Sequence, residues 1–148
     1  MHTLTEKERI TGAMRAFIRQ RPGLDPREYG DRHGYRQESR RITQDLHQAE
    51  TLLEQIELSG MTADELREGF RAYSGRLSWD GGRLEYATGQ FFPTEFRAAV
   101  CAVCAAALWN YHRDDYTTTA KAGESAGDAL RRNFRRRFGR TIAERWFN

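Results

Sequence analysis

Length, composition and charge place this chain among globular proteins. With 148 residues, of which 39% are hydrophobic and 30% charged, it can bury a core without disulfides or metals, and its composition excludes a fibrous or largely disordered protein. The net charge of +3 is uneven, since residues 123–148 hold seven Arg and three acidic residues whereas residues 1–122 carry a net charge of −1. The amino-terminal residues have no apolar run typical of a signal peptide, so we expect a cytoplasmic protein that does not contact membranes.

A first amphipathic helix is predicted after a capping box formed by Thr5 and Glu8. Apolar residues then recur at helical spacing up to residue 21, where Pro22-Gly23 ends the helix. Residues 25–34 are polar and are expected to form a loop.

The longest helix is predicted for residues 35–58. Its apolar residues are spaced alternately four and three apart, which is the heptad pattern of a packing seam. They are Ile42, Leu46, Ala49, Leu53 and Ile56. About three heptads is short for an isolated coiled coil, so we expect the seam to pack inside the domain. A homodimer through the 35–58 helix is the alternative.

A third helix and a β-hairpin are predicted next. Thr62 and Glu65 form a second capping box, which begins a helix that extends to residue 73. Apolar and polar residues then alternate on both sides of Asp80-Gly81-Gly82, the pattern of a hairpin over residues 76–87. Because an isolated hairpin is only marginally stable, its apolar side chains should rest on the helices.

The domain is expected to be organised around residues 98–109. This run has no charged or amide side chain and is rich in Ala, which predicts a helix that is buried on all sides. With Pro93 in its first turn, the central helix should cover residues 93–112, and a polar loop should follow at 114–124. The predicted fold is therefore mainly α, a single-domain bundle of five or six helices around a buried central helix, with one small hairpin.

The strongest chemical feature is in the helix predicted for residues 125–138. Its inward-facing residues are expected to be Ala126, Leu130, Phe134 and Phe138. Four arginines spread over the remaining arc, and we call them the basic ridge: Arg131, Arg132, Arg135 and Arg136. Gly139 should end this helix, and Thr141 with Glu144 should cap a last short helix.

Three interpretations of the basic ridge are open. Guanidinium groups bind phosphate well, so the ridge and Arg140 could contact nucleic acid or a nucleoprotein complex in a salt-dependent, mostly sequence-independent way. The arginines could instead pair with the acidic face of the 35–58 helix, or with an acidic protein partner. The leading hypothesis is nucleic-acid binding, with Phe134 and Phe138 holding the helix in place.

Two other patterns carry weaker chemical signals. Cys101 and Cys104 match C-x-x-C, but they lie inside an apolar helix and lack a second Cys pair, so core packing is expected and no cofactor or metal. His112 lies beside Asp114 and Asp115, where a metal-dependent hydrolase site could be built. Because the common catalytic motifs are missing from the sequence, we expect a non-enzymatic protein.

Three segments carry a resemblance to known proteins. They are Gly127-Asp-Ala-Leu-Arg-Arg, Phe138-Gly-Arg-Thr-Ile-Ala-Glu-Arg-Trp-Phe and Arg9-Ile-Thr-Gly-Ala-Met-Arg-Ala-Phe-Ile-Arg. These segments resemble parts of small accessory proteins carried by phages, plasmids and integrative elements. The resemblance transfers no catalytic residue and implies only a context, because such proteins often bind nucleic acid or, as anti-CRISPR proteins do, block a host defence complex.

An anti-defence inhibitor that binds a host protein complex is therefore the alternative function. Its interface would include the hairpin tip and the loop before the central helix, with the residues Asp80, Gly81, Gly82, Phe91 and Phe92.

Overall fold

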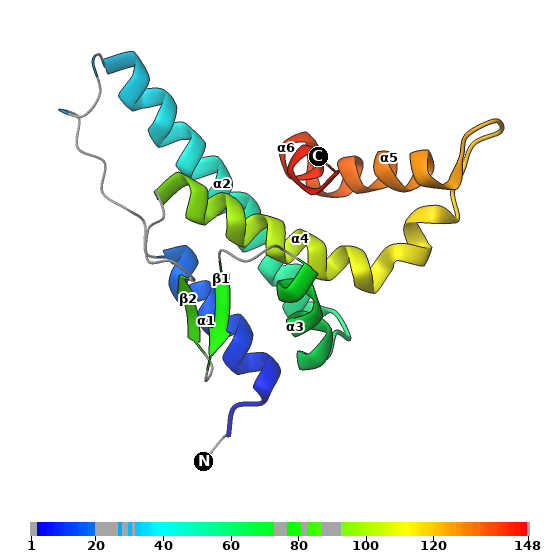
Figure 1. The fold of residues 1–148 in the computed structure, drawn as a ribbon, viewed down its shortest axis with the longest axis horizontal. Helices are drawn as coiled ribbons and strands as arrows, with labels where there is room; N and C mark the ends of the chain where they lie inside the picture. Colours follow the sequence, from blue (N-terminus) through cyan, green and yellow to red (C-terminus); the bar gives the residue numbers. More distant parts are fainter. Residues whose placement is uncertain are drawn as a thin grey trace.

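Helix α4 (Pro93–Thr117) runs through the middle of the molecule, and the other helices pack against it (Figure 1). The computed structural model describes residues 3–19, 27, 30, 32–72, 77–80, 83–86 and 93–147. The other helices in these ranges are α1 (Glu6–Arg19), α2 (Arg32–Leu58), α3 (Ala63–Ala72), α5 (Ala126–Phe138) and α6 (Arg140–Phe147). The helical bundle around a buried central helix is thus confirmed, with six helices in the described residues.

The burial of α4 follows from its Ala-rich sequence. Every side chain from residue 99 to 109 is at most 8% exposed. The small side chains allow α3 and α4 to approach closely, since a Cβ added to Gly69 of α3 would lie 2.7 Å from the Cβ of Ala107.

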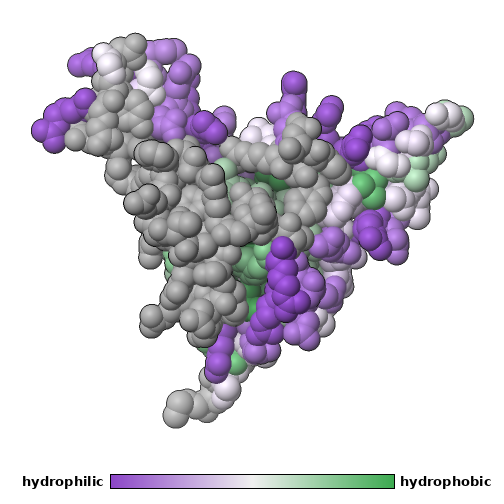
Figure 2. Space-filling view, viewed as in Figure 1, coloured by the Kyte–Doolittle hydropathy of each residue, from purple (hydrophilic) through white to green (hydrophobic). Residues whose placement is uncertain are grey.

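In the space-filling view, hydrophilic residues dominate the visible described surface, and hydrophobic residues show mainly near the centre (Figure 2). Within the described ranges, no helix has the length and apolar character needed to span a bilayer.

Both predicted capping boxes form. The Thr5 hydroxyl accepts a hydrogen bond from the Glu8 amide (3.1 Å), and the Glu8 carboxylate accepts one from the Thr5 amide (3.2 Å). Thr62 and Glu65 make the same reciprocal pair at 3.2 Å in both directions. Because each box satisfies amides that the helix itself leaves unpaired, it explains where α1 and α3 begin.

The heptad seam of α2 packs inside the chain. Ala49, Leu53 and Ile56 are at most 1% exposed and belong to the hydrophobic core that contains α4, and Leu46 packs against that core. The seam is therefore covered by the chain itself, as expected. A homodimer through this helix would have to use its outer face.

The strands β1 (Leu77–Asp80) and β2 (Arg83–Tyr86) lie where the hairpin is predicted. They pair antiparallel, with Leu77 opposite Tyr86 and Trp79 opposite Leu84, and they lie beside α1 (Figure 1). The turn residues Gly81 and Gly82 are outside the described residues, as are Phe91 and Phe92. Of the five predicted protein-interface residues, only the backbone of Asp80, the last residue of β1, is described.

Two helix starts differ from the predictions. Helix α2 begins at Arg32, so His33 and Gly34 are helical and do not belong to the predicted loop. Arg and Gln favour helix, and one Gly costs only about 1 kcal/mol, which the rest of a long helix can offset. Helix α6 begins at Arg140, and Thr141 lies within it instead of capping it. The first carbonyl acceptor is that of Gly139, which receives the Ala143 amide at 3.2 Å.

Helix α4 is longer than predicted, and this change affects the site. It continues to Thr117, so the predicted polar loop over residues 114–124 begins later in the chain. The added turn carries Tyr116, whose ring stacks on Trp109 at a centroid distance of 5.9 Å. This aromatic contact stabilises helix at residues whose polar neighbours suggest a loop.

Candidate nucleic-acid interface

Helix α5 is attached to α4 by aromatic side chains. Phe134 is completely buried, and its ring lies 4.9 Å from Trp109 and 4.7 Å from Phe138. The inward orientation predicted for Phe134 and Phe138 is confirmed. Ala129 is buried whereas Ala126 is exposed, so the buried face is rotated slightly from the predicted one.

The sequence of α5 suits a helix with a basic end. Ser125 is the amino-terminal cap, and its hydroxyl accepts the Asp128 amide at 3.1 Å. Asp128 lies in the first turn, and Arg135, Arg136 and Arg137 lie in the last, where their charges are favourable with respect to the helix dipole. The same residues that stabilise the helix therefore concentrate positive charge at its carboxyl end.

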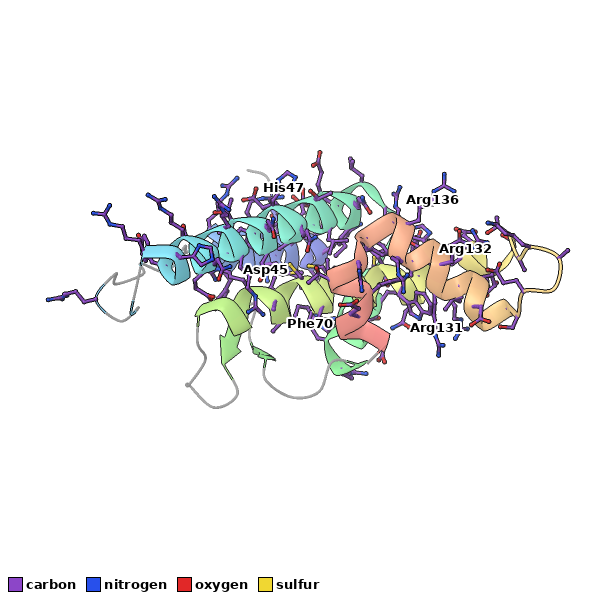
Figure 3. The ribbon with its side chains drawn as sticks, turned by 90° about the horizontal axis from the view of Figure 1, so that it is seen from above. Asp45, His47, Phe70, Arg131, Arg132 and Arg136 are labelled. Carbon is purple, nitrogen blue, oxygen red and sulfur yellow. The ribbon has the colours of Figure 1, made fainter. Side chains whose placement is uncertain are left out.

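The four arginines of the basic ridge differ in exposure. Arg131, Arg135 and Arg136 are exposed, whereas Arg132 is partly buried. Figure 3 shows Arg131 and Arg136 on opposite sides of α5, with Arg132 between them. The guanidinium groups of Arg135 and Arg136 make no ion pair or hydrogen bond with the part of the chain that the structure describes. These two side chains therefore leave their charge available to an external anion.

The Arg132 guanidinium makes hydrogen bonds within the chain. Its Nε and Nη2 donate to the two carboxylate oxygens of Glu124 at 3.1 and 3.0 Å, and Nη2 also donates to the Thr119 carbonyl at 2.9 Å. Hydrogen bonding to Arg132, and then to the Lys121 amide, lowers the pKa of Glu124, and the same pairing raises the pKa of Arg132. The guanidinium thus ties α5 to the α4–α5 link, residues 118–125.

Other polar contacts complete this tie. The Asn133 side-chain amide donates to the Tyr116 carbonyl at 2.8 Å and also to the Thr119 hydroxyl. Arg140 pairs with Glu144 within α6, with Nε 2.7 Å from the carboxylate. Intramolecular pairing therefore occurs for Arg132 and Arg140, but their partners lie in the link and in α6. The alternative of intramolecular pairing placed these partners on the acidic face of the 35–58 helix.

The two cysteines are packing residues of the core. Cys101 and Cys104 are free thiols with no exposed surface. Burial raises the pKa of Cys104 well above its ordinary value, so the thiol stays protonated. The Cys101 thiol donates to the Asp45 carbonyl of α2 at 2.9 Å. These surroundings favour packing over a redox role, in agreement with the prediction.

The predicted acidic and histidine residues are only partly brought together. His112 Nδ1 lies 3.2 Å from the Asp115 carboxylate, and both are on α4. Asp114 is exposed, and its backbone carbonyl accepts the Thr117 hydroxyl. Across the described ranges, no group of three or more His, Cys, Asp or Glu side chains is placed to hold a metal ion. The hydrolase alternative therefore gains no third ligand from these residues.

Two buried charged residues were missed by the sequence analysis. Asp45 and Arg97 are only 3% and 2% exposed. Arg97 Nη1 donates to the Phe17 carbonyl at 2.7 Å, which places a cation at the carboxyl end of α1. Arg97 lies one helical turn before the buried Cys101, and this spacing is the signal that could have identified it.

Exposed arginines also occur far from α5. The first turns of α2 carry Arg36 and Arg40, both exposed, before the buried seam begins at Ile42. These residues offer a matched comparison for the ridge, since they have the same side chain and exposure class on another helix.

Comparison with protein-family models, curated proteins and solved structures finds no match to this chain. The resemblance of its ends to accessory proteins of mobile elements therefore stays a prediction.

Proposed function

We propose that this chain is a non-enzymatic binding module that engages nucleic acid or a nucleoprotein complex through the basic ridge of α5. The observation that carries the proposal is the exposure of Arg135 and Arg136 on a helix whose other side is fixed by Phe134. Guanidinium groups on a rigid helix can contact phosphates without first ordering a flexible segment, which lowers the entropic cost of binding.

The spacing of the exposed arginines suits an extended polyanion. Arg131 and Arg135 lie one helical turn apart, about 6 Å along the axis, and Arg136 projects from a different side of the helix (Figure 3). Arg135 and Arg136, which make no ion pair or hydrogen bond with the described residues, can therefore contact different phosphates. Such contacts release counterions, give little base specificity and weaken as salt increases.

Arg132 and Arg140 are less available for phosphate contacts than Arg135 and Arg136. Arg132 already donates to the Glu124 carboxylate and Arg140 to the Glu144 carboxylate. A phosphate would have to compete with these carboxylates for the guanidinium groups. Arg132 also holds the α4–α5 link through Thr119. Replacing it would test structure and binding together, so Arg135 and Arg136 are the better test positions.

The test is binding of the purified protein to labelled double-stranded DNA, single-stranded DNA and RNA over a salt series. Arg135→Gln/Arg136→Gln should weaken binding at least tenfold at low salt, since contacts between charged groups are worth about 1.5–3 kcal/mol each. Arg36→Gln/Arg40→Gln, with the same change in net charge, should bind within about twofold of the wild type.

Two results would count against this function. Equal weakening by both double variants would mean that net charge, not the ridge, controls binding. Failure of the wild type to bind any nucleic acid at low salt, together with co-purification of a host protein complex that persists at moderate salt, would favour the anti-defence inhibitor.

A further inference from the structure

Two adjacent cavities lie where α5 meets the end of α4, and Arg137 lines both of them. The first, about 310 Å³, is bordered by Gln55 and Leu58 of α2, by Tyr111 and His112 of α4, and by Arg137. The second, about 370 Å³, is bordered by Asp115, Tyr116, Asn133, Arg136 and Arg137. Both are open to solvent, and their volumes are at the lower end of those of small-ligand sites. We call the two together the Arg137 cleft.

The first cavity has the lining of a site for a flat, partly apolar group. Tyr111 and His112 supply aromatic rings with centroids 4.6 Å apart and nearly perpendicular planes. A Cβ on Gly60 would lie 2.7 Å from the Tyr111 hydroxyl, so the hydroxyl end of this side chain packs closely against Gly60. Leu58, which is 82% exposed, adds an apolar edge, and Gln55 adds an amide that can both donate and accept.

The second cavity has the lining of an anion site with a polar rim. Arg136 and Arg137 contribute two guanidinium groups. The carboxylate of Asp115, which would repel an anion, lies 3.2 Å from His112 Nδ1, and the Asn133 amide is held by the Tyr116 carbonyl. The balance of charge therefore favours a phosphate at the arginines.

The cleft is continuous with the basic ridge. Arg136 belongs to both, since it is a ridge residue and also borders the second cavity. A strand whose phosphates contact the ridge would therefore pass the mouth of the cleft. In a duplex the bases are stacked and paired, whereas in a single strand a base can turn out and stack on aromatic side chains.

We propose that the Arg137 cleft binds one nucleotide of a single-stranded nucleic acid, with its base against Tyr111 and His112 beside Gln55, and its phosphate at Arg136 and Arg137. The inference rests on the proposed function and narrows it to single strands as the preferred ligand. Duplex DNA would use the ridge but not the first cavity.

The test compares a fluorescein-labelled dT12 oligonucleotide with a labelled 12-base-pair duplex, using anisotropy titrations. His112→Ala and Tyr111→Leu should each weaken dT12 binding roughly tenfold, because loss of stacking costs about 1–3 kcal/mol per base. Duplex binding should change less than twofold. His47→Ala, at an exposed histidine on α2 (Figure 3), is the matched control and should change neither.

The outcomes separate the cleft from the ridge. His112 is partly exposed and its replacement should preserve the fold, so that variant decides the matter even if Tyr111→Leu is unstable. If His112→Ala binds dT12 as tightly as the wild type while Arg135→Gln still weakens duplex binding, the proposal for the cleft is wrong and the proposal for the ridge stands. No wild-type binding to either probe would overturn both proposals.

Discussion

Phe134→Ala should show how strongly α5 is fixed to the core. Phe134 is completely buried and its ring contacts Trp109 and Phe138 at centroid distances of 4.9 and 4.7 Å. Truncating a buried Phe to Ala costs about 3–5 kcal/mol. Since the whole domain is expected to have about 5–15 kcal/mol of stability, this single change should remove a large part of it.

Urea denaturation and thermal melting, both followed by circular dichroism, measure this loss of stability. In a protein of this size each kcal/mol corresponds to about 2–4 °C in melting temperature, so Phe134→Ala should melt roughly 6–20 °C lower. Arg135→Gln, at the next residue, which is exposed, should stay within about 0.5 kcal/mol of the wild type. A change of less than 1 kcal/mol for Phe134→Ala would show that aromatic packing does not hold α5, and the rigid ridge would lose its basis.

Three further predictions test the fold and its polar contacts. Gly69→Ala should destabilise the protein by about 1–3 kcal/mol because its Cβ would overlap Ala107. Gly12→Ala, with open space around it, should stabilise the protein by about 0.5–1 kcal/mol. Equal effects of the two substitutions in urea titrations would contradict the close α3–α4 approach. Pairing with Arg132 lowers the pKa of Glu124 from its ordinary 4.5, so the carboxylate stabilises the fold above that pH and loses this contribution as the pH falls through its lower folded-state pKa. The stability difference between wild type and Glu124→Gln should therefore be present at pH 7 and shrink below about pH 4.5. A difference that does not vary with pH would count against the pairing. Cys101 and Cys104 should not react with a thiol reagent such as DTNB at pH 8 in the native protein but should both react in urea, since neither has exposed surface; rapid native labelling would show that α4 is not the buried centre.

Local sequence signals predicted most of the helices. The capping boxes at Thr5 and Thr62 and the apolar run inside α4 act over a few residues, so their structural result can be anticipated from spacing alone. The heptad seam of α2 was also recognisable, because burial on one side of a helix imposes its own period.

The parts that sequence reasoning missed depend on contacts between distant residues. The last turn of α4 is helical because Tyr116 packs on Trp109 and near Phe134 of α5, and local propensity there favours a loop. The burial of Arg97 depends on the Phe17 carbonyl, 80 residues away in sequence. The capping box expected at Thr141 does not form because α6 already begins at Arg140, where the Gly139 carbonyl is the first acceptor.

The same distinction applies to the candidate site. The basic ridge could be predicted because its arginines lie on one short helix with regular spacing. That Arg132 is tied to Glu124 while Arg135 and Arg136 are not depends on how the α4–α5 link returns along α5. Arg137 was not among the arginines predicted to contact phosphates, and only the packing of α5 on α4 places it between two cavities.

Whether α5 binds nucleic acid is decided most directly by the dependence of duplex-DNA affinity on salt concentration. Each phosphate contact contributes about 0.9 to the slope of log affinity against log salt, so Arg135→Gln/Arg136→Gln should reduce the slope by about 1.8. Arg36→Gln/Arg40→Gln should keep the wild-type slope. A slope that is unchanged in the ridge variant, or equally reduced in both variants, would contradict the assignment of nucleic-acid binding to α5.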